Sequence, residues 1–310
     1  SGIDAVAIVT PNHLHAPVAH AFLDAGIHVI CDKPLALTLA EGDALAAKAH
    51  QNRLMFAVTY NYSGYPMVRR ARQLVRQGVL GMLRLVQVEY AQDWLSAPLE
   101  ASGQKQAAWR TDPAQAGAAG CLGDIGTHAY QLACFVTGLL ASHISVELTT
   151  FVPGRQLDDN VQAMLRFSEG VRGSLWASQV AAGAANGLRL RVYGEKGSLE
   201  FSQEHPEKLL LHRAGGETTQ FRRGCGEPGA TEHNRIPAGH PEGFIEAFAQ
   251  IYSDAAACVR AYQEGNAVPA CALDLPTVAD GVAGLVFVQA ALASAANSGA
   301  WVALRGSTDS

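Results

Sequence analysis

Two short stretches of the sequence combine residue types that can exchange protons and stabilise charge. In Cys31-Asp32-Lys33-Pro34, an acid and a lysine directly follow an apolar run. Further on, Asp124 and His128 lie four residues apart, which places two side chains on the same face of a helix. A neutral histidine can act as a general base, and a lysine ammonium can stabilise a developing oxyanion. Lys33, Asp124 and His128 are therefore the candidates for acid–base chemistry.

Each stretch alone also fits a structural role. The lysine could belong to a surface ion pair before a turn-forming proline, and the aspartate could cap a helix that contains a partly buried histidine. A third polar stretch, Thr10-Pro11-Asn12, ends an apolar run and could contact a ribose or a nicotinamide. His13 and His15 follow it, but no other ligand type clusters nearby, so no metal site is expected. Asp158-Asp159 is interpreted as a solvated entry to a strand.

The elements that must position these residues alternate regularly in the first 80 residues. Short apolar runs at 5–9, 27–31 and 54–59 are typical of buried parallel strands. Helical stretches at 15–25, 38–51 and 66–77 separate and follow them, the second opened by a Thr38/Glu41 capping box. This alternation predicts a doubly wound parallel sheet. Its strands would end along one edge, where such folds bind ligands.

The pattern changes after Gly81 to consecutive strands with short turns. It predicts a large, mostly antiparallel open sheet in an α+β domain. We therefore expect one domain with a parallel sheet over residues 1–80 and a second, α+β domain over 81–310. Within the second domain, the sequence predicts a loop over 94–120, helices over 124–137, 241–264 and 276–296, and strands over 83–92, 143–151, 160–168, 171–179, 188–193, 198–202, 208–212 and 301–304.

Composition excludes several classes of protein. Of the 310 residues, 48% are hydrophobic and 16% are charged, which indicates a packed globular chain rather than a disordered one. The formal net charge of -5 argues against nucleic acid as a partner. The longest apolar segment, 284–296, is interrupted by Gln289 and is expected to pack as a helix inside the protein. No membrane association is therefore predicted. Six cysteines without a C-x-x-C pair indicate a reducing compartment, with the cytoplasm expected.

In combination, the run TPNxxH…AGxHVxCDKPLAxT and the stretch GDIGTH resemble the Gfo/Idh/MocA oxidoreductases. Segments at 109–113, 151–155 and 236–243 resemble the inositol- and sugar-dehydrogenase branches, including levoglucosan dehydrogenase-like proteins. The resemblance implies that Lys33, Asp124 and His128 are catalytic. It implies cofactor contacts from one set of residues and substrate contacts from another. The first set is Thr10, Pro11, Asn12, His15, Asp32, Lys33 and Pro34, and the second is Asn61, Trp109, Arg110, Asp124 and His128.

The resemblance also implies an activity: hydride transfer between NAD or NADP and a hydroxyl of a sugar, anhydrosugar or inositol-like polyol. It implies that residues 1–80 are the C-terminal part of a Rossmann dinucleotide-binding domain and that residues 81–310 form a substrate-binding and oligomerisation domain. It also implies a homo-oligomer, a dimer or tetramer. Two departures stand out: Asp32 replaces the usual glutamate, and no G-x-G-x-x-G occurs in the chain, so we expect an N-terminally truncated sequence. Two alternatives stay open: a non-catalytic dinucleotide- or sugar-binding regulator, and a redox-neutral, NAD-assisted glycosidase or epimerase.

Overall fold

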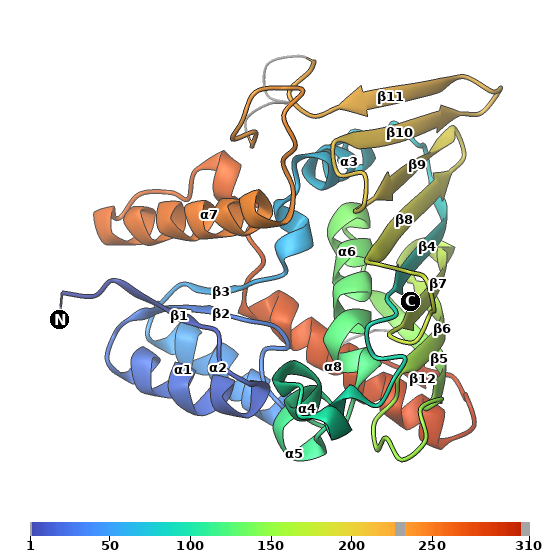
Figure 1. Ribbon diagram of the computed structural model, residues 1–310. Coiled ribbons are helices and arrows are strands. Elements are labelled where there is room, and N and C mark those ends of the chain that lie inside the picture. Colours follow the sequence, from blue (N-terminus) through green and yellow to red (C-terminus); the bar gives the residue numbers. More distant parts are fainter. Residues whose placement is uncertain (1, 227–232, 305–310) are drawn as a thin grey trace.

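The computed structural model describes residues 2–226 and 233–304. Its first sheet contains three parallel strands in the order β1-β2-β3, as the sequence predicted. Two helices, α1 and α2, connect them and cover one face (Figure 1). The bounds are Ala5–Ile8 for β1, His15–Asp24 for α1, His28–Cys31 for β2, Leu39–Gln51 for α2 and Phe56–Val58 for β3.

The parallel sheet is covered on both faces. Along β2, Val29 and Cys31 pack with α1 and α2, whereas Ile30 packs with Ile251 of helix α7 (Phe244–Glu264) on the other face. Strand side chains alternate between faces, so a strand covered on both faces is expected to be mostly apolar. All four residues of β2 are indeed buried. The helix expected from residue 241 begins at Phe244.

The second sheet has nine strands in the order β11-β10-β9-β8-β4-β7-β6-β5-β12. β4 lies between β8, to which it runs antiparallel, and β7, its single parallel neighbour. The result is the large, mostly antiparallel sheet that was expected, with one further strand, β11. The bounds are Leu83–Ala91 (β4), Ala141–Thr149 (β5), Asn160–Phe167 (β6), Arg172–Ser178 (β7), Gly187–Gly194 (β8), Gly197–Ser202 (β9), Lys208–Arg213 (β10), Thr218–Arg222 (β11) and Val302–Ala303 (β12).

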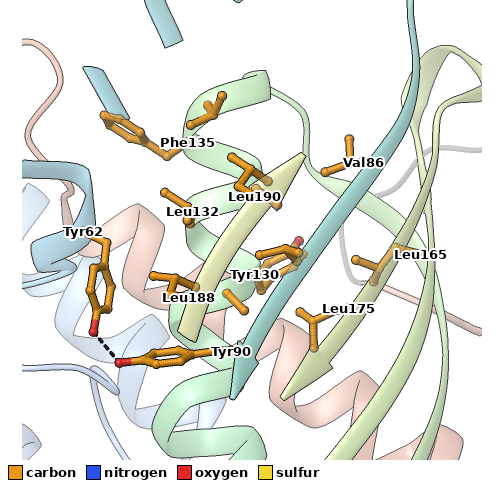
Figure 2. Packing of buried hydrophobic residues seen from close by; sticks show 14 of the residues in the cluster. Tyr62, Val86, Tyr90, Tyr130, Leu132, Phe135, Leu165, Leu175, Leu188 and Leu190 are labelled. Atoms are coloured by element: carbon orange, nitrogen blue, oxygen red, sulfur yellow. Dashed lines mark hydrogen bonds between the residues drawn. The ribbon is translucent and has the colours of Figure 1, made fainter. Parts of the chain in front are cut away.

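Helices α3 (Pro66–Arg76) and α6 (Thr127–Thr137) cover one face of this sheet. Figure 2 shows the packing, in which Leu132 of α6 lies beside Leu188 and Leu190 of β8 in one buried cluster. The opposite face is open over β4 and β6, where Leu85 is 50% exposed and Met164 is 55% exposed. One face of the large sheet is therefore packed against helices, whereas the other is exposed over β4 and β6.

Helix α8 (Val278–Ala296) joins the two sheets, because it contacts α2 and β3 on one side and β5 on the other. Among the described residues, it is the one helix with the length and apolar composition that a membrane span requires. It packs in the interior: Phe287 is fully buried in the core of the large sheet, and Leu285 packs with Leu35 beside the small one. The segment expected to pack as a helix does so.

Packing around the expected boundary at residue 80 is intertwined. Met67 and Leu74 of α3 belong to the core of the large sheet although they precede that boundary. Conversely, α7 and α8 return from the second half of the chain to cover the parallel sheet. The division at residue 80 remains a prediction, and the ligand-binding edge of the small sheet is enclosed by elements from both halves.

One expectation was wrong in detail. The segment 94–120 is not a continuous loop, because it contains a 3₁₀ turn (Leu99–Ser102) and two short helices, α4 (Lys105–Arg110) and α5 (Pro113–Ala116). Gln104 caps α4 through a bond to the N–H of Ala107, and Asp112 caps α5 by accepting from Ala114 at 3.0 Å. Such short helices lack the apolar period that would reveal them in the sequence.

Candidate active site

A cleft of about 770 Å³ lies where the carboxyl ends of β1, β2 and β3 face α6 and the large sheet. It brings together nearly all the residues singled out in the sequence. These are Thr10, Pro11, Asn12, His15, Asp32, Lys33, Asn61, Trp109, Arg110, Asp124 and His128. Pro34, adjoining Lys33 through a cis peptide bond, lies just outside this lining.

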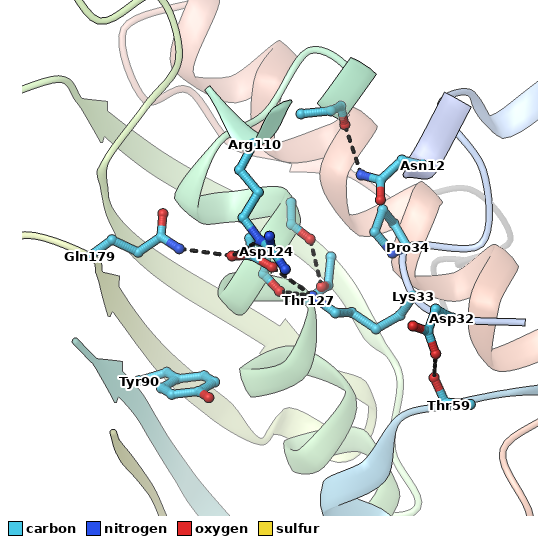
Figure 3. A network of polar contacts seen from close by, with 12 residues as sticks. Asn12, Asp32, Lys33, Pro34, Thr59, Tyr90, Arg110, Asp124, Thr127 and Gln179 are labelled. Carbon is cyan, nitrogen blue, oxygen red and sulfur yellow. Dashed lines mark hydrogen bonds and ion pairs between the residues drawn. The ribbon is translucent and has the colours of Figure 1, made fainter. Parts of the chain in front are cut away.

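Lys33 and Asp124 are joined directly across the cleft. The Lys33 ammonium, two residues past β2, donates to Oδ1 of Asp124 at 2.9 Å and also to its main-chain oxygen (Figure 3). Their side chains keep 14% and 22% of their surface exposed, so both remain accessible from the cleft. The ion pair thus links the end of the parallel sheet to the residues that lead into α6.

Asp124 does not lie in the regular helix that its spacing from His128 suggested. Residues Leu122–Gly126 form a π-helical turn, in which the N–H of Thr127 bonds to the carbonyl of Leu122, five residues back. The α-helix α6 begins only at Thr127, whose hydroxyl donates to the Gly123 carbonyl at 2.9 Å. Single π-helical turns are frequent at functional sites. This one presents Asp124, with its main-chain oxygen, to Lys33.

Several donors hold Asp124 in its ionised form. Burial would raise the pKa of this carboxyl, but the charges of Lys33 and Arg110 and the Lys33 hydrogen bond outweigh it and lower the pKa. Gln179 donates to Oδ2 at 2.8 Å, and Nε of Arg110 lies 3.4 Å from the same oxygen. The hydrogen bonds to this carboxylate therefore come from Lys33 and Gln179, rather than from His128, within the described chain.

His128 is 8% exposed and lies in an aromatic surround. The rings of Tyr62 and Tyr60 meet it edge-on, with centroids 4.9 and 5.9 Å away. Burial lowers the pKa of His128 well below its ordinary value, and the charge of Lys33 lowers it further, although Asp124 opposes this. Its Nδ1 is buried without a hydrogen-bond partner among the described residues. The imidazole is therefore neutral at pH 7, as a general base requires.

The strand ends that should face the cofactor are held by bonds within the protein. The Asn12 amide donates to the Ala116 carbonyl at 3.1 Å, and the Thr59 hydroxyl donates to Asp32 at 2.5 Å. Both ring nitrogens of the fully buried His15 lie 2.8 Å from carbonyl oxygens, those of Thr10 and Pro34. His15 thus ties the two loops together.

The Thr10 hydroxyl tests whether the residues at this end of the cleft fit a dinucleotide. This buried oxygen lines the cleft without a hydrogen-bond partner among the described residues. A polar atom left free at the carboxyl end of a parallel strand suits the ribose or amide of a nicotinamide nucleotide. The residues present at this end of the cleft therefore fit the expected group.

The substrate-side candidates also reach the cleft. The Arg110 guanidinium stacks over the Trp109 ring at 4.2 Å, and both come from α4. Asn61 is 2% exposed, and its amide nitrogen has no partner among the described residues, so it can donate to a ligand. Their assignment to substrate remains a prediction.

Two features of the site escaped the sequence analysis. Gln179, just past β7, had no local motif to mark it. Tyr62 and Tyr90 bond to each other through their hydroxyls, and Tyr90 donates to Asn186 at 2.8 Å. Tyr90 lies on β4 within a regular strand pattern, where an aromatic residue is ordinarily interpreted as core. Only the fold brings Tyr62 and Tyr90 into the lining of the cleft and Gln179 into contact with Asp124.

Comparison with known proteins agrees with this geometry. Residues 1–60 match an oxidoreductase family with an NAD-binding Rossmann fold, and residues 68–200 match the GFO/IDH/MocA C-terminal domain. The uncharacterized oxidoreductase YfiI of Bacillus subtilis is 32% identical over 97% of this chain and 78% of its own length. Levoglucosan dehydrogenase of Pseudarthrobacter phenanthrenivorans is 32% identical over 67% of this chain and 58% of that protein.

Solved structures give the same result. An inositol dehydrogenase homologue from Azotobacter vinelandii, complexed with NAD+, superposes with a TM-score of 0.91 at 36% identity, covering 97% of this chain and 78% of that one. A levoglucosan dehydrogenase complexed with NADH and levoglucosan gives 0.86 at 30% identity, covering 98% and 80%. Fold and cleft together define an oxidoreductase with a dinucleotide-binding domain. The chain belongs to the Gfo/Idh/MocA family.

Proposed function

We propose that this protein is an NAD(P)-dependent dehydrogenase that oxidises a CH–OH group of a sugar, anhydrosugar or inositol-like polyol. One observation carries the proposal: the 2.9 Å contact between Lys33 and Asp124, in the same cleft as a neutral, buried His128. A cation, an ionised acid and a base then surround one ligand position.

In the proposed reaction, His128 removes the proton of the substrate hydroxyl. A nicotinamide, when bound, supplies the carbon that accepts the hydride. Lys33 stabilises the negative charge that develops on the substrate oxygen, and Asp124 fixes the Lys33 ammonium and accepts from a substrate hydroxyl. Burial of His128 keeps it unprotonated and therefore ready to accept that proton.

Two sets of residues would hold the ligands. Thr10, Pro11, Asn12, His15, Asp32 and Pro34 would form the cofactor side with Lys33. Asn61, Trp109 and Arg110 would join Asp124 and His128 on the substrate side. Among the described residues that line the cleft, the cations Lys33 and Arg110 are matched in number by the carboxylates Asp32 and Asp124. The lysine, arginine and aspartate side chains of the lining therefore carry no net charge, which favours an uncharged polyhydroxyl substrate over a phosphorylated one.

The test is turnover of the full-length protein, followed by reduced-nicotinamide absorbance. NAD and NADP would each be offered with inositols, anhydrosugars and aldoses. Lys33→Ala and His128→Ala should abolish turnover. Lys48→Ala is the matched control, because Lys48 also pairs with an aspartate, Asp24 at 2.7 Å, but lies outside the cleft. Tight dinucleotide binding without any turnover would favour a regulator, and substrate conversion without net reduced cofactor would favour the redox-neutral enzyme.

We further propose a homo-oligomer, a dimer or tetramer, that associates through the open face of the large sheet. This face carries the exposed Leu85 and Met164 together with Trp176. Light scattering of the full-length protein at micromolar concentration tests this proposal, and a monomer at that concentration would contradict it.

All six cysteines are free, which supports a cytoplasmic location.

A further inference from the structure

Asp158 and Asp159, expected at a solvated strand entry, are buried instead. They directly precede β6, and their exposed fractions are 9% and 0%. Neither belongs to the lining of the cleft. Because a buried carboxylate is costly unless hydrogen bonds compensate for it, their partners show what the fold gains from them.

Asp158 holds the three residues that lead into the π-helical turn. Its Oδ1 accepts from the N–H of Gly120 and its Oδ2 from the N–H of Leu122, both at 2.7 Å. Its main-chain oxygen accepts from the N–H of Cys121 at 2.8 Å. Three successive backbone donors thus end on one residue. We call this set, Asp158 with residues 120–122, the Asp158 clasp.

The clasp lies two residues from Asp124. The N–H of Asp124 donates to the Gly120 carbonyl at 2.9 Å, so the backbone of Asp124 rests on a residue that Asp158 holds. The contact is close: a Cβ on Gly120 would lie 2.2 Å from the Asp158 carbonyl oxygen. Only glycine allows this approach.

Asp159 holds the other side of the same carboxylate. Its main-chain oxygen accepts from the N–H of Gln179 at 2.9 Å, and the Gln179 side chain donates to Oδ2 of Asp124 at 2.8 Å. Its own carboxylate accepts from Phe151 and Val152 at 2.8 and 3.0 Å and pairs with Arg155 at 3.2 Å. Two adjacent buried acids therefore support both the backbone and a hydrogen-bond donor of Asp124.

From this geometry we infer that Asp158 is a positioning residue of the active site, whose ionised carboxylate sets Asp124 opposite Lys33. The inference rests on the proposed dehydrogenase function. Burial, the largest influence, raises the pKa of Asp158 to about 6, although the bonds from Leu122 and Gly120 oppose the rise. The fold therefore keeps a carboxylate at this position although its burial disfavours the charged form. Residues with pKa values shifted in this way are often found at functional sites.

The first test compares Asp158→Asn with Asp280→Asn in the full-length protein. Asparagine keeps the shape but turns an NH₂ group toward one of the two backbone donors, so one bond is lost. Asp280 is a matched control, because it also accepts from a backbone N–H, that of Thr277 at 2.7 Å, and does not line the cleft.

We expect kcat of Asp158→Asn to fall about 10- to 100-fold, the effect of a lost hydrogen bond to a charged group. The dissociation constant for the dinucleotide should stay within about twofold, because the strand ends of the parallel sheet are untouched. Asp280→Asn should keep its kcat. An active wild-type protein with an unchanged kcat in Asp158→Asn would overturn this inference alone.

A second readout needs neither turnover nor a folded variant. In the wild-type protein, the amide proton resonances of Gly120 and Leu122 should shift together as Asp158 takes up a proton near pH 6. If the two resonances do not respond, the clasp is overturned whatever the variants do. Joint titration in a protein without turnover would support the clasp and overturn the proposed function.

Discussion

Gln179 donates a 2.8 Å hydrogen bond to the Asp124 oxygen that Lys33 leaves free, so the two carboxylate oxygens have separate protein partners. We expect Gln179→Leu to lower kcat/KM about 10- to 100-fold, because a hydrogen bond to a charged group is lost. Steady-state kinetics with the substrate that supports turnover measures this. Gln73→Leu, which removes an exposed partner of Arg70 on α3, is the control and should have no effect.

Burial first, and the charge of Lys33 second, lower the pKa of His128. Because the ammonium and burial both disfavour a second positive charge, we expect Lys33→Met to raise the pKa of His128 toward its ordinary value. NMR titration of labelled histidine side chains measures the change directly and does not depend on turnover. An unchanged or lower pKa in the variant would show that the two side chains are not coupled.

Gly120 allows the chain to pass close to Asp158. Since a Cβ at this position would lie 2.2 Å from a backbone oxygen, we expect Gly120→Ala to destabilise the protein by about 1–3 kcal/mol and to reduce activity. Urea unfolding measures the first effect. At Gly187 the nearest atom to an added Cβ is 3.6 Å away, so Gly187→Ala should be tolerated. Equal losses in both variants would contradict the steric explanation.

A deeply buried ion pair away from the cleft joins Arg69 of α3 to Asp254 of α7 at 2.5 Å, with both side chains 3% exposed. We expect Arg69→Met to cost about 3–5 kcal/mol of unfolding free energy, because it leaves Asp254 buried without its cation. Lys48→Met, which breaks an exposed pair with Asp24, should cost at most about 1 kcal/mol. Chemical denaturation of both variants makes the comparison.

The sequence could predict the parts of the site that lie within one local pattern. Lys33 follows an apolar strand, so a strand-end argument reaches it. The four-residue spacing singled out Asp124 and His128, although Asp124 lies in the π-helical turn that precedes α6 rather than in the helix itself. The same arguments could not reach Gln179 or Asp158. These residues approach Asp124 only because β4 pairs with β7 in parallel and β6 follows alongside, a topology that no short-range pattern specifies.

Asp158 also shows why the charge of a residue does not predict its burial from the sequence alone. Two adjacent aspartates in a sequence are ordinarily solvated, because isolated buried carboxylates are unfavourable. Here backbone N–H groups of residues 120, 122, 151 and 152 compensate for them. Those partners lie up to 38 residues away along the chain. Their approach depends on the complete fold, and so does the burial of the pair.

The Lys33–Asp124 pair spans two separately packed cores, since Lys33 extends from the parallel sheet and Asp124 lies in a turn packed on the large one. The pair forms only when the two cores are docked, and α7 and α8 from the second half of the chain complete the packing of the parallel sheet. The large sheet also depends on distant pairings, such as Leu85 with Arg172, which form slowly. During refolding, recovery of catalysis should therefore lag behind recovery of secondary structure. The time course of enzymatic activity would then report when the two cores dock.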